Sequence, residues 1–263
     1  MKLLWQKREA EVKITPEVVK AAAGNSRQGI QIMKLLLEKR EAEVKITLEV
    51  VEAVAGNSEQ GVELMKLLLK KREAEVKITL QIVEAAARNS RLGIELIDLL
   101  FNQPGAEIKI IPEVVKAAAG NSQQGVELMK LLWQKRKAEV KITPEVVKAA
   151  AGNWRQGVEL MDFLLSQPGA KVTITPEVIN SQQSIELIKL LSKKREAEVD
   201  ITPGVFEAAA NNPEQGMQLM RALVTALSIH GPLHVLPQHQ VLSSTLCRYK
   251  FPGSSVWLYL HHG

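Results

Sequence analysis

The sequence predicts an all-α solenoid: a one-dimensional stack of about seven helix-turn-helix repeats, each of about 32 residues and joined to the next by a short extended connector. Three observations predict this fold. One pattern recurs along the chain, and the segment Thr143–Ile174 closely copies Thr15–Ile46. Each copy holds two apolar runs at helical spacing. Aromatic residues make up only 4% of the 263 residues, which suits thin helices packed closely together. Internal similarity at a period of roughly 20 to 50 residues is the signature of repeat architectures.

The repeats are numbered 1 to 7 in chain order. They begin at Thr15, Thr47, Thr79, Ile111, Thr143, Thr175 and Thr202. These starts are evenly spaced up to repeat 6, and repeat 7 begins earlier than that spacing predicts. Repeat 6 is short because Ile179 is followed directly by Asn180, without the five residues that complete an Ala-rich stretch elsewhere. We therefore expect repeat 6 to have lost most of its first helix, which should leave a gap or a kink.

The first helix of each repeat has a recognisable start and end. In repeat 1, Thr15 is in the N-cap position, Pro16 takes the first helical position, and Glu17 lies near the positive end of the helix. Small apolar residues follow. Gly24 and Asn25 end the helix, because both tolerate the left-handed conformation common at helix C-termini.

The second helix begins after an asparagine. Asn25 and Gln28 have the spacing of a variant capping box, in which each side chain would bind a backbone N–H at the helix start. The same spacing recurs at Asn57 and Gln60, Asn121 and Gln124, Asn153 and Gln156, and Asn180 and Gln183. Gly29 and its counterparts would each cost about 1 kcal/mol inside a helix relative to alanine. We therefore expect them to mark close helix contacts.

The connector Glu41–Ile46 alternates charged and apolar residues. This alternation predicts a short extended segment that turns Ala42, Val44 and Ile46 inward.

The two ends differ from the repeats. Met1 aligns with a methionine inside the second helix, so we expect the chain to be a fragment of a longer protein. Residues 1–229 form the predicted repeat domain. Residues 230–263 hold all five His, both Tyr and the only Cys, and no acidic residue, so we expect a disordered tail unrelated to the repeats.

Composition limits the classes of function. The predicted repeat domain holds all but two of the 34 Lys and Arg residues and all 29 Asp and Glu residues, a balance too even to indicate nucleic-acid binding by itself. A lone Cys247 excludes an internal disulfide framework. No apolar run is long enough to cross a membrane, and the charged N-terminus is unlike a signal peptide. We expect a soluble, cytoplasmic protein.

The repeats contain no His and no Cys, the residues most often used as nucleophiles, bases and transition-metal ligands. We therefore predict no enzyme, no cofactor, no metal site and no small-molecule substrate. His230, His234 and His239 could suggest a metal site, but intervening Gly and Pro residues would break the helix needed to align them.

Basic pairs recur at the ends of the second helices, at residues 7–8, 39–40, 71–72, 135–136 and 194–195. Cations are favoured at the negative end of a helix, so a structural role explains them. A functional basic stripe is the alternative.

Variation between repeats points to a binding surface. Polar residues vary at the start of the second helix while the surrounding positions barely change. Our candidates for partner contact are Arg27, Glu59, Arg91, Gln123, Trp154, Arg155 and Gln182. Trp154 replaces a serine found in other repeats, and tryptophan is enriched at binding hot spots. Trp133 belongs to a second variable column and fits either the core or a contact surface.

The motif ITPEVVKAAAGN, followed by GVELMKLLL and in one repeat by Gly105-Ala106-Glu107-Ile108, resembles ankyrin repeats. It is most similar to the degenerate ankyrin-like repeats of fungal ankyrin-repeat and NLR-like proteins. The resemblance implies recognition of another protein. Only Lys45 and Ile46 separate Val44 from Thr47, so the long β-finger through which ankyrin repeats often bind is absent.

The spacing of Thr-Pro-Glu, Val-Val and Asn also resembles the repeats of transcription-activator-like effectors, which read DNA. That resemblance would make Asn25-Ser26 and its counterparts base-reading pairs. Nearly all of these pairs are Asn-Ser, which could specify little, and the family's phosphate-contacting Gly-Gly-Lys-Gln is missing. We therefore predict a protein-protein interaction or scaffold module. The alternatives are a nucleic-acid-binding solenoid and a truncated gene product without independent activity.

Overall fold

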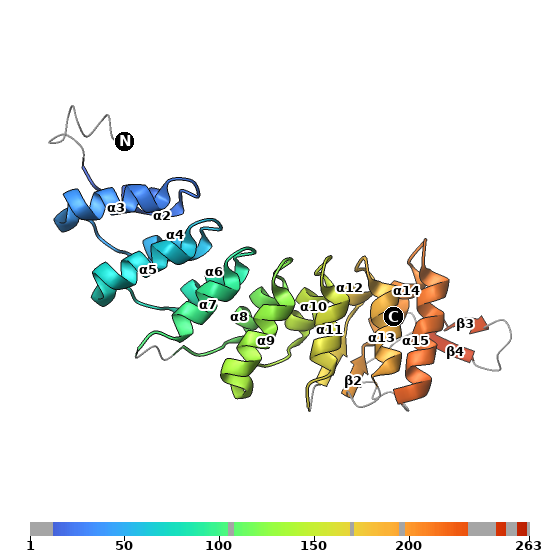
Figure 1. The fold of residues 1–263 in the computed structure, drawn as a ribbon. Helices are drawn as coiled ribbons and strands as arrows, with labels where there is room; N and C mark the ends of the chain where they lie inside the picture. Colours follow the sequence, from blue (N-terminus) through green and yellow to red (C-terminus); the bar gives the residue numbers. More distant parts are fainter. Residues whose placement is uncertain are drawn as a thin grey trace. The chain divides into compact units, whose positions relative to one another are not determined.

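The structure is a computed structural model that describes residues 13–104, 108–168, 171–194, 198–230, 246–250 and 257–261. The chain forms two compact bodies, Met1–Leu233 and His234–Gly263. All of the described helices belong to the first body, where helix pairs pack one after another in sequence order (Figure 1). The predicted all-α solenoid of repeated helix pairs is confirmed.

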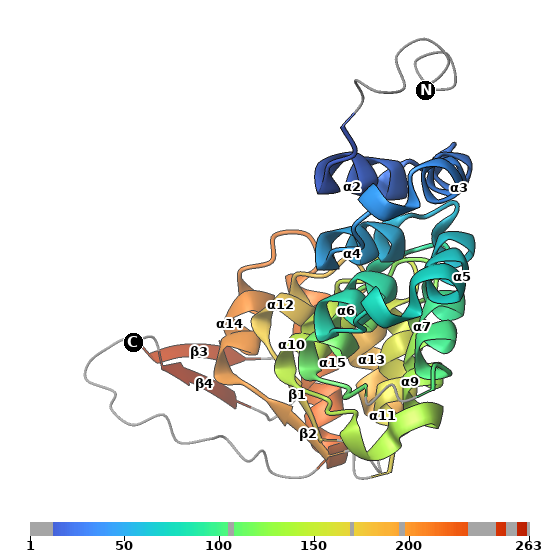
Figure 2. The ribbon, with the colours of Figure 1, turned by 90° about the vertical axis from the view of Figure 1, so that its left-hand side faces the viewer.

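The repeats contribute two layers of helices, because the first helices contact one another and so do the second helices (Figure 2). The first helices are α2 (Pro16–Gly24), α4 (Leu48–Gly56), α6 (Leu80–Arg88), α8 (Pro112–Ala119), α10 (Pro144–Ala151), α12 (Pro176–Ile179) and α14 (Pro203–Ala210). The second helices are α3 (Gly29–Lys39), α5 (Gly61–Arg72), α7 (Gly93–Phe101), α9 (Gly125–Arg136), α11 (Gly157–Leu165), α13 (Ser184–Lys193) and α15 (Gly216–His230). Apolar side chains between the layers make a continuous core, in which Met33, Met65 and Met129 are fully buried.

Repeat 6 has lost most of its first helix, as the sequence predicts. Its first helix, α12, contains 4 residues, whereas α10 in repeat 5 contains 8. Val178 and Ile179 of α12 are fully buried. The second helix α13 retains 10 residues and contacts both α11 and α15. The deletion therefore thins the layer of first helices at repeat 6, where α12 still contacts α10 and α14, and leaves the second helix of the repeat intact.

The glycines that begin the second helices allow close contact with the first helices. A Cβ atom added to Gly61 would lie 2.8 Å from the carbonyl oxygen of Val54, and one added to Gly29 would lie 2.9 Å from that of Ala22. These distances are too short for a real Cβ, so the predicted close contact is confirmed. Repeat 6 carries Ser184 at this position, beside the shortened helix.

The connectors follow the prediction only in part. Val44 and Ile46 are buried as expected, but Ala42 is exposed, and that part of the prediction is wrong. Residues Glu41–Glu43 form a short 3-10 helix, η1, because the Val44 N–H donates to the Glu41 carbonyl and the Arg40 guanidinium binds Glu43. Equivalent turns are η2 (Glu73–Glu75) and η3 (Lys137–Glu139).

The connectors after repeats 5 and 6 are extended, as the alternation predicts. Strand β1 (Lys171–Ile174) pairs in parallel with β2 (Glu198–Ile201), with Ile174 opposite Ile201. This pairing joins the connector that follows repeat 5 to the connector that follows repeat 6.

The second body is described only in strands β3 (Leu246–Lys250) and β4 (Trp257–His261), which pair antiparallel with Leu246 opposite His261. The other tail residues from 231 onward lie outside the described residues, so the predicted disorder of the tail stays a prediction. Met1, the basic pair at residues 7–8 and most of the Gly105–Ile108 motif also lie outside them.

Candidate interaction surface

The turn between the two helices of each repeat is shaped by its asparagine. In repeat 1, Asn25 Oδ1 accepts hydrogen bonds from the backbone N–H groups of Arg27 (3.1 Å) and Gln28 (2.8 Å). The same bonds recur at Asn57, Asn89, Asn121, Asn153 and Asn212. The asparagine half of the predicted capping box is therefore confirmed at four of the five predicted pairs, and Asn89 and Asn212 make the same bonds without having been predicted to.

The amide nitrogen of the same asparagine reaches into the preceding repeat. Nδ2 of Asn57 donates to the carbonyl oxygens of Ala23 (2.9 Å) and Asn25 (3.2 Å). Asn89, Asn121 and Asn153 make the equivalent pairs of bonds, all between 2.9 and 3.1 Å. These four side chains are at most 5% exposed. They form a chain of rungs through repeats 1 to 5, which we call the asparagine ladder.

The glutamine half of the predicted capping box is wrong. Gln60 does not reach back to Asn57. Its carboxamide instead spans to repeat 1, where Oε1 accepts from the Ile30 N–H (3.0 Å) and Nε2 donates to the Arg27 carbonyl (3.2 Å). Gln124, Gln156 and Gln183 likewise bind the preceding repeat. The predicted pair of Asn180 with Gln183 fails for another reason, since Asn180 is exposed and only Gln183 reaches back.

The candidate contact residues lie directly over this network. Residues 27, 59, 91, 123, 155 and 182, one from each of repeats 1 to 6, are all exposed, and with Trp154 they form what we call the display ridge. In most repeats the asparagine holds the ridge residue's own backbone N–H, and in some the next glutamine binds a ridge carbonyl as well. The ridge backbone is therefore fixed while its side chains are free to differ.

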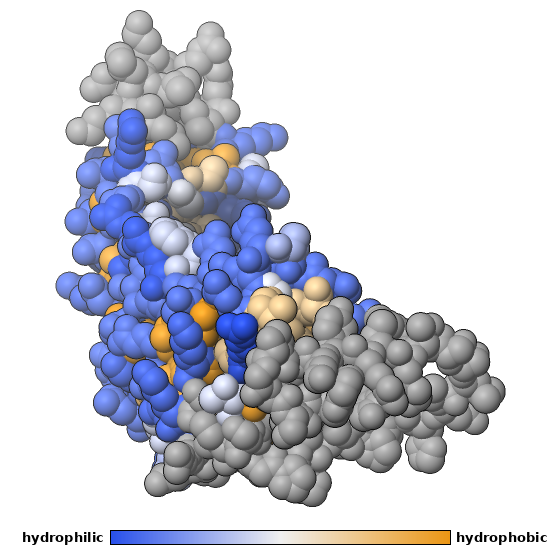
Figure 3. Space-filling model, turned by 90° about the vertical axis from the view of Figure 1, so that its right-hand side faces the viewer, coloured by the Kyte–Doolittle hydropathy of each residue, from blue (hydrophilic) through white to orange (hydrophobic). Residues whose placement is uncertain are grey.

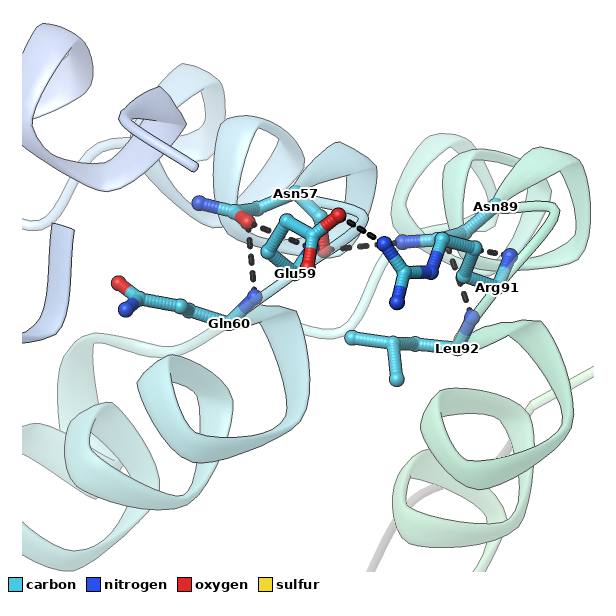
Figure 4. A network of polar contacts seen from close by, with 6 residues as sticks. All are labelled: Asn57, Glu59, Gln60, Asn89, Arg91 and Leu92. Carbon is cyan, nitrogen blue, oxygen red and sulfur yellow. Dashed lines mark hydrogen bonds and ion pairs between the residues drawn. The ribbon is translucent and has the colours of Figure 1, made fainter. Parts of the chain in front are cut away.

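Two contacts join side chains of the display ridge to each other. The carboxylate of Glu59 pairs with the guanidinium of Arg91 in the next repeat (Figure 4). Trp154 is 59% exposed, and the guanidinium carbon of Arg155 lies 4.8 Å from its ring centroid. The other candidate tryptophan, Trp133, is half-buried and meets the edge of Phe163 with a centroid distance of 6.2 Å, so it contributes to packing between repeats.

Six segments of the chain match a family described as "Domain of unknown function (DUF7104)": residues 3–33, 35–65, 67–96, 99–129, 131–161 and 190–220. Together they cover more than half of the sequence. The chain belongs to this family. The unmatched stretch between residues 161 and 190 contains the shortened helix α12. No curated protein and no solved structure matches the chain.

In these family repeats the basic pairs form contacts between neighbours. Arg72 binds Glu75 and also donates to the carbonyls of Glu41 (3.1 Å) and Val44 (3.1 Å) in the preceding repeat. Lys135 pairs with Asp98 at 2.8 Å, and Lys194 pairs with Asp162 at 2.9 Å. These contacts support the structural interpretation of the basic pairs.

Among the described residues on the face shown in Figure 3, most are hydrophilic, and the apolar ones lie in small groups.

Four of the threonines that precede first helices, Thr15, Thr47, Thr143 and Thr175, form a hydrogen bond with the glutamate two residues later. A hydrogen bond with the Thr15 hydroxyl and the N–H of Glu17 itself lower the pKa of the Glu17 carboxyl. Hydrogen bonds with Thr175, with the N–H of Glu177 and with Lys148 lower the pKa of Glu177 to about 2. The expected Thr cap bond to the helix is present at Thr143, which accepts from Val146 at 3.4 Å. The other described Thr N-caps lack it.

Within the described residues, no helix is both long and apolar enough to cross a membrane, and no group of three His, Cys, Asp or Glu side chains is arranged to hold a metal ion. The side chains of His230, His234 and His239 are not among those described, so the tail site considered above is untested.

The asparagine ladder was not among the features predicted from the sequence. A signal for it was present, because Asn recurs at one position beside neighbours that vary between Ser and Trp and between Arg, Glu and Gln. A polar residue that stays constant where its exposed neighbours change is typical of a buried structural hydrogen bond.

Proposed function

We propose that this chain is a protein-protein interaction module that binds its partner along the display ridge. The observation that carries the proposal is the pairing of a fixed backbone with variable side chains. Each ridge residue from repeats 1 to 6 is exposed. Beneath the ridge, the asparagine and glutamine bonds repeat almost unchanged from one repeat to the next. A surface held in place before binding loses little conformational entropy on binding.

The charges of the ridge favour a protein partner over a nucleic acid. Arg27, Arg91 and Arg155 alternate with Glu59 and with the neutral Gln123 and Gln182. Phosphate backbones are bound by gathered positive charge, and here Arg91 is already paired with Glu59. The ladder asparagines are buried and bonded to carbonyls, so they are not available to read bases. By its likeness to degenerate ankyrin-like repeats, the module would serve as the recognition part of a cytoplasmic protein.

The proposal is tested by crosslinking from the ridge. A photoreactive amino acid is placed at residue 123 on the ridge or, as a matched control, at residue 130, which is exposed on the second helix of the same repeat. In an extract of the protein's own cells, we expect one protein to crosslink from residue 123 and not from residue 130.

Competition then decides whether the crosslink reports the ridge. Excess unmodified chain should abolish the crosslink, whereas the double variant Trp154→Ala, Arg155→Glu should compete at least tenfold less well. Equal competition by both chains, or equal crosslinking from both positions, would contradict the proposal.

A further inference from the structure

The asparagine ladder ends where the first helix of repeat 6 is cut short. In each of the four junctions between repeats 1 and 5, an asparagine amide binds two carbonyls of the preceding repeat, as Asn153 binds those of Ala119 (3.1 Å) and Asn121 (2.9 Å). The next junction should use the carbonyls of Ala151 and Asn153. Asn180, the asparagine of repeat 6, is exposed and binds neither of them. One rung is therefore missing.

The glutamine contact at the same junction is intact. Gln183 Oε1 accepts from the Val158 N–H (3.1 Å), and its Nε2 donates to the Trp154 carbonyl (2.9 Å). Repeat 6 therefore keeps its glutamine contact with repeat 5, and only the asparagine contact is absent. The Asn57 carbonyl accepts two hydrogen bonds, one from the Gly61 N–H and one from the Asn89 side-chain amide. The Asn153 carbonyl accepts the equivalent bond from the Gly157 N–H but has no ladder amide. A carbonyl oxygen has two lone pairs, so Asn153 retains one for a second donor.

A groove lies beside the missing rung, between the end of α10 and residues 180–183. Its volume is about 540 Å³, and its lining includes Ala151, Gly152, Trp154 and Gln182. Ala151 is the last residue of α10 and corresponds to Ala119, whose carbonyl receives an asparagine amide. Lys148 and Glu177 also line the groove, and they pair with each other at 3.3 Å. The lining thus combines an alanine whose counterpart accepts an asparagine amide, a broad indole and an already paired lysine and glutamate, which fits a neutral hydrogen-bond donor.

We infer that this groove binds an asparagine-bearing turn of a partner protein, whose side-chain amide donates to the carbonyl of Ala151. The molecule shows this chemistry four times, because the corresponding alanine carbonyl in each of repeats 1 to 4 accepts from the amide of an asparagine that follows a small-residue helix end. No residue outside the described ranges is an asparagine, so those segments hold no counterpart of the ladder residue. The inference rests on the proposed function and specifies the chemistry of its partner.

The test uses the full chain and a fluorescein-labelled peptide with the sequence of residues 112–125, which contains the turn around Asn121. Fluorescence polarisation should show saturable binding. A peptide with leucine in place of that asparagine should bind at least tenfold more weakly, because it lacks the amide donor. Equal binding of the two peptides, or no binding of either, overturns the inference.

Two protein variants locate the site. Insertion of Lys-Ala-Ala-Ala-Gly between Ile179 and Asn180 restores a full first helix and should abolish peptide binding by filling the groove. Trp154→Ala, at an exposed position that does not threaten folding, should weaken peptide binding several-fold, and Arg27→Ala, far along the ridge, should leave it unchanged. Unchanged binding to the insertion variant overturns the inference.

The outcomes separate this inference from the proposed function. If the insertion variant still competes fully for the partner that crosslinks from residue 123, the groove is not used and the ridge proposal stands. If sedimentation shows a dimer that the insertion variant loses, the occupant is a second copy of this chain, and the assignment to a different partner is overturned.

Discussion

The junction between repeats 4 and 5 and the junction between repeats 5 and 6 both pair an asparagine with a glutamine, but the first helix that precedes this asparagine is shortened in repeat 6. In the first, Asn153 is buried and Gln156 reaches back, so both contacts are made. In the second, Gln183 reaches back while Asn180 stays exposed. The glutamine contact and the asparagine contact therefore form independently of each other. The glutamine depends on the second helix, which repeat 6 retains, whereas the asparagine needs a full first helix to place it against the preceding repeat.

The largest expected effect comes from removing one rung. Asn121→Ala would leave the Ala87 carbonyl and the Gln123 and Gln124 N–H groups without their partner, and the Asn89 carbonyl would keep only its bond from the Gly93 N–H. Buried polar groups left unpaired cost about 1 to 3 kcal/mol each, partly relieved by relaxation, so we expect the free energy of unfolding to fall by about 3 kcal/mol. Urea denaturation measures it.

The matched control is Asn180→Ala, which we expect to change the free energy of unfolding by less than about 0.5 kcal/mol, as is usual for an exposed site. Similar losses in the two variants would mean that the ladder does not distinguish the two junctions.

A second comparison uses the glycine that begins the second helix. Gly61→Ala places a Cβ 2.8 Å from the Val54 carbonyl, so the helices must separate. We expect a loss of about 2 kcal/mol, within the usual range for overpacking and despite the better helix propensity of alanine. Ser184→Ala in repeat 6, where a Cβ is already accommodated, should cost clearly less. Thermal and urea unfolding of both variants check this, and a stabilising Gly61→Ala would contradict it.

A third prediction concerns local stability. The turn at residues 179–183 lacks the asparagine bonds that hold residues 121–124, so its backbone should open more readily. We expect amide hydrogen exchange there to be at least tenfold faster than in the turn of repeat 4. Exchange followed by mass spectrometry or NMR measures both turns in one sample, and uniform protection across repeats 4 to 6 would rule out a weakened junction.

The smallest effect is electrostatic. The pKa of Glu177 is lowered from 4.5 to about 2 by Thr175, its own N–H and Lys148. Because the pKa is lower in the folded state, the bonds of the ionised Glu177 carboxylate with Thr175, its own N–H and Lys148 contribute stability that is fully present above about pH 4.5 and is lost as the pH falls through about 2. An NMR titration of the Glu177 side chain should show this pKa, and Lys148→Ala should raise it. An unchanged pKa in that variant would show that the pair across the repeat 5 and 6 junction contributes nothing.

Much of the fold could be predicted from residues that act locally. Thr15 and Pro16 mark the start of a first helix, and the spacing of Met33 and its neighbours marks the core face of a second helix. The loss of helix in repeat 6 follows from counting residues between Thr175 and Asn180. The predicted contact residues Arg27, Gln123 and Trp154 are exposed, because variable polar positions in a repeat tend to face solvent.

The contacts between repeats could not be predicted in this way. Gln60 fits a capping box within its own helix and equally a bond to the preceding repeat, and only the stacking distance decides between them. The alternation of charged and apolar residues predicted an extended connector with Ala42 turned inward. The ion pair of Arg40 with Glu43 holds a 3-10 turn instead, and Ala42 is exposed.

The sequence by itself determined the repeat length, the helix pairs, the shortened repeat and the exposed variable positions, because each depends on residues close together in the chain. Only the folded structure shows that the recurring asparagine joins consecutive repeats, that the glutamine reaches backward, and that Ala151 lines a groove beside the missing rung. The physical reason is that a side-chain amide can bond to many backbone groups, and its partner is fixed only when two repeats pack at one distance.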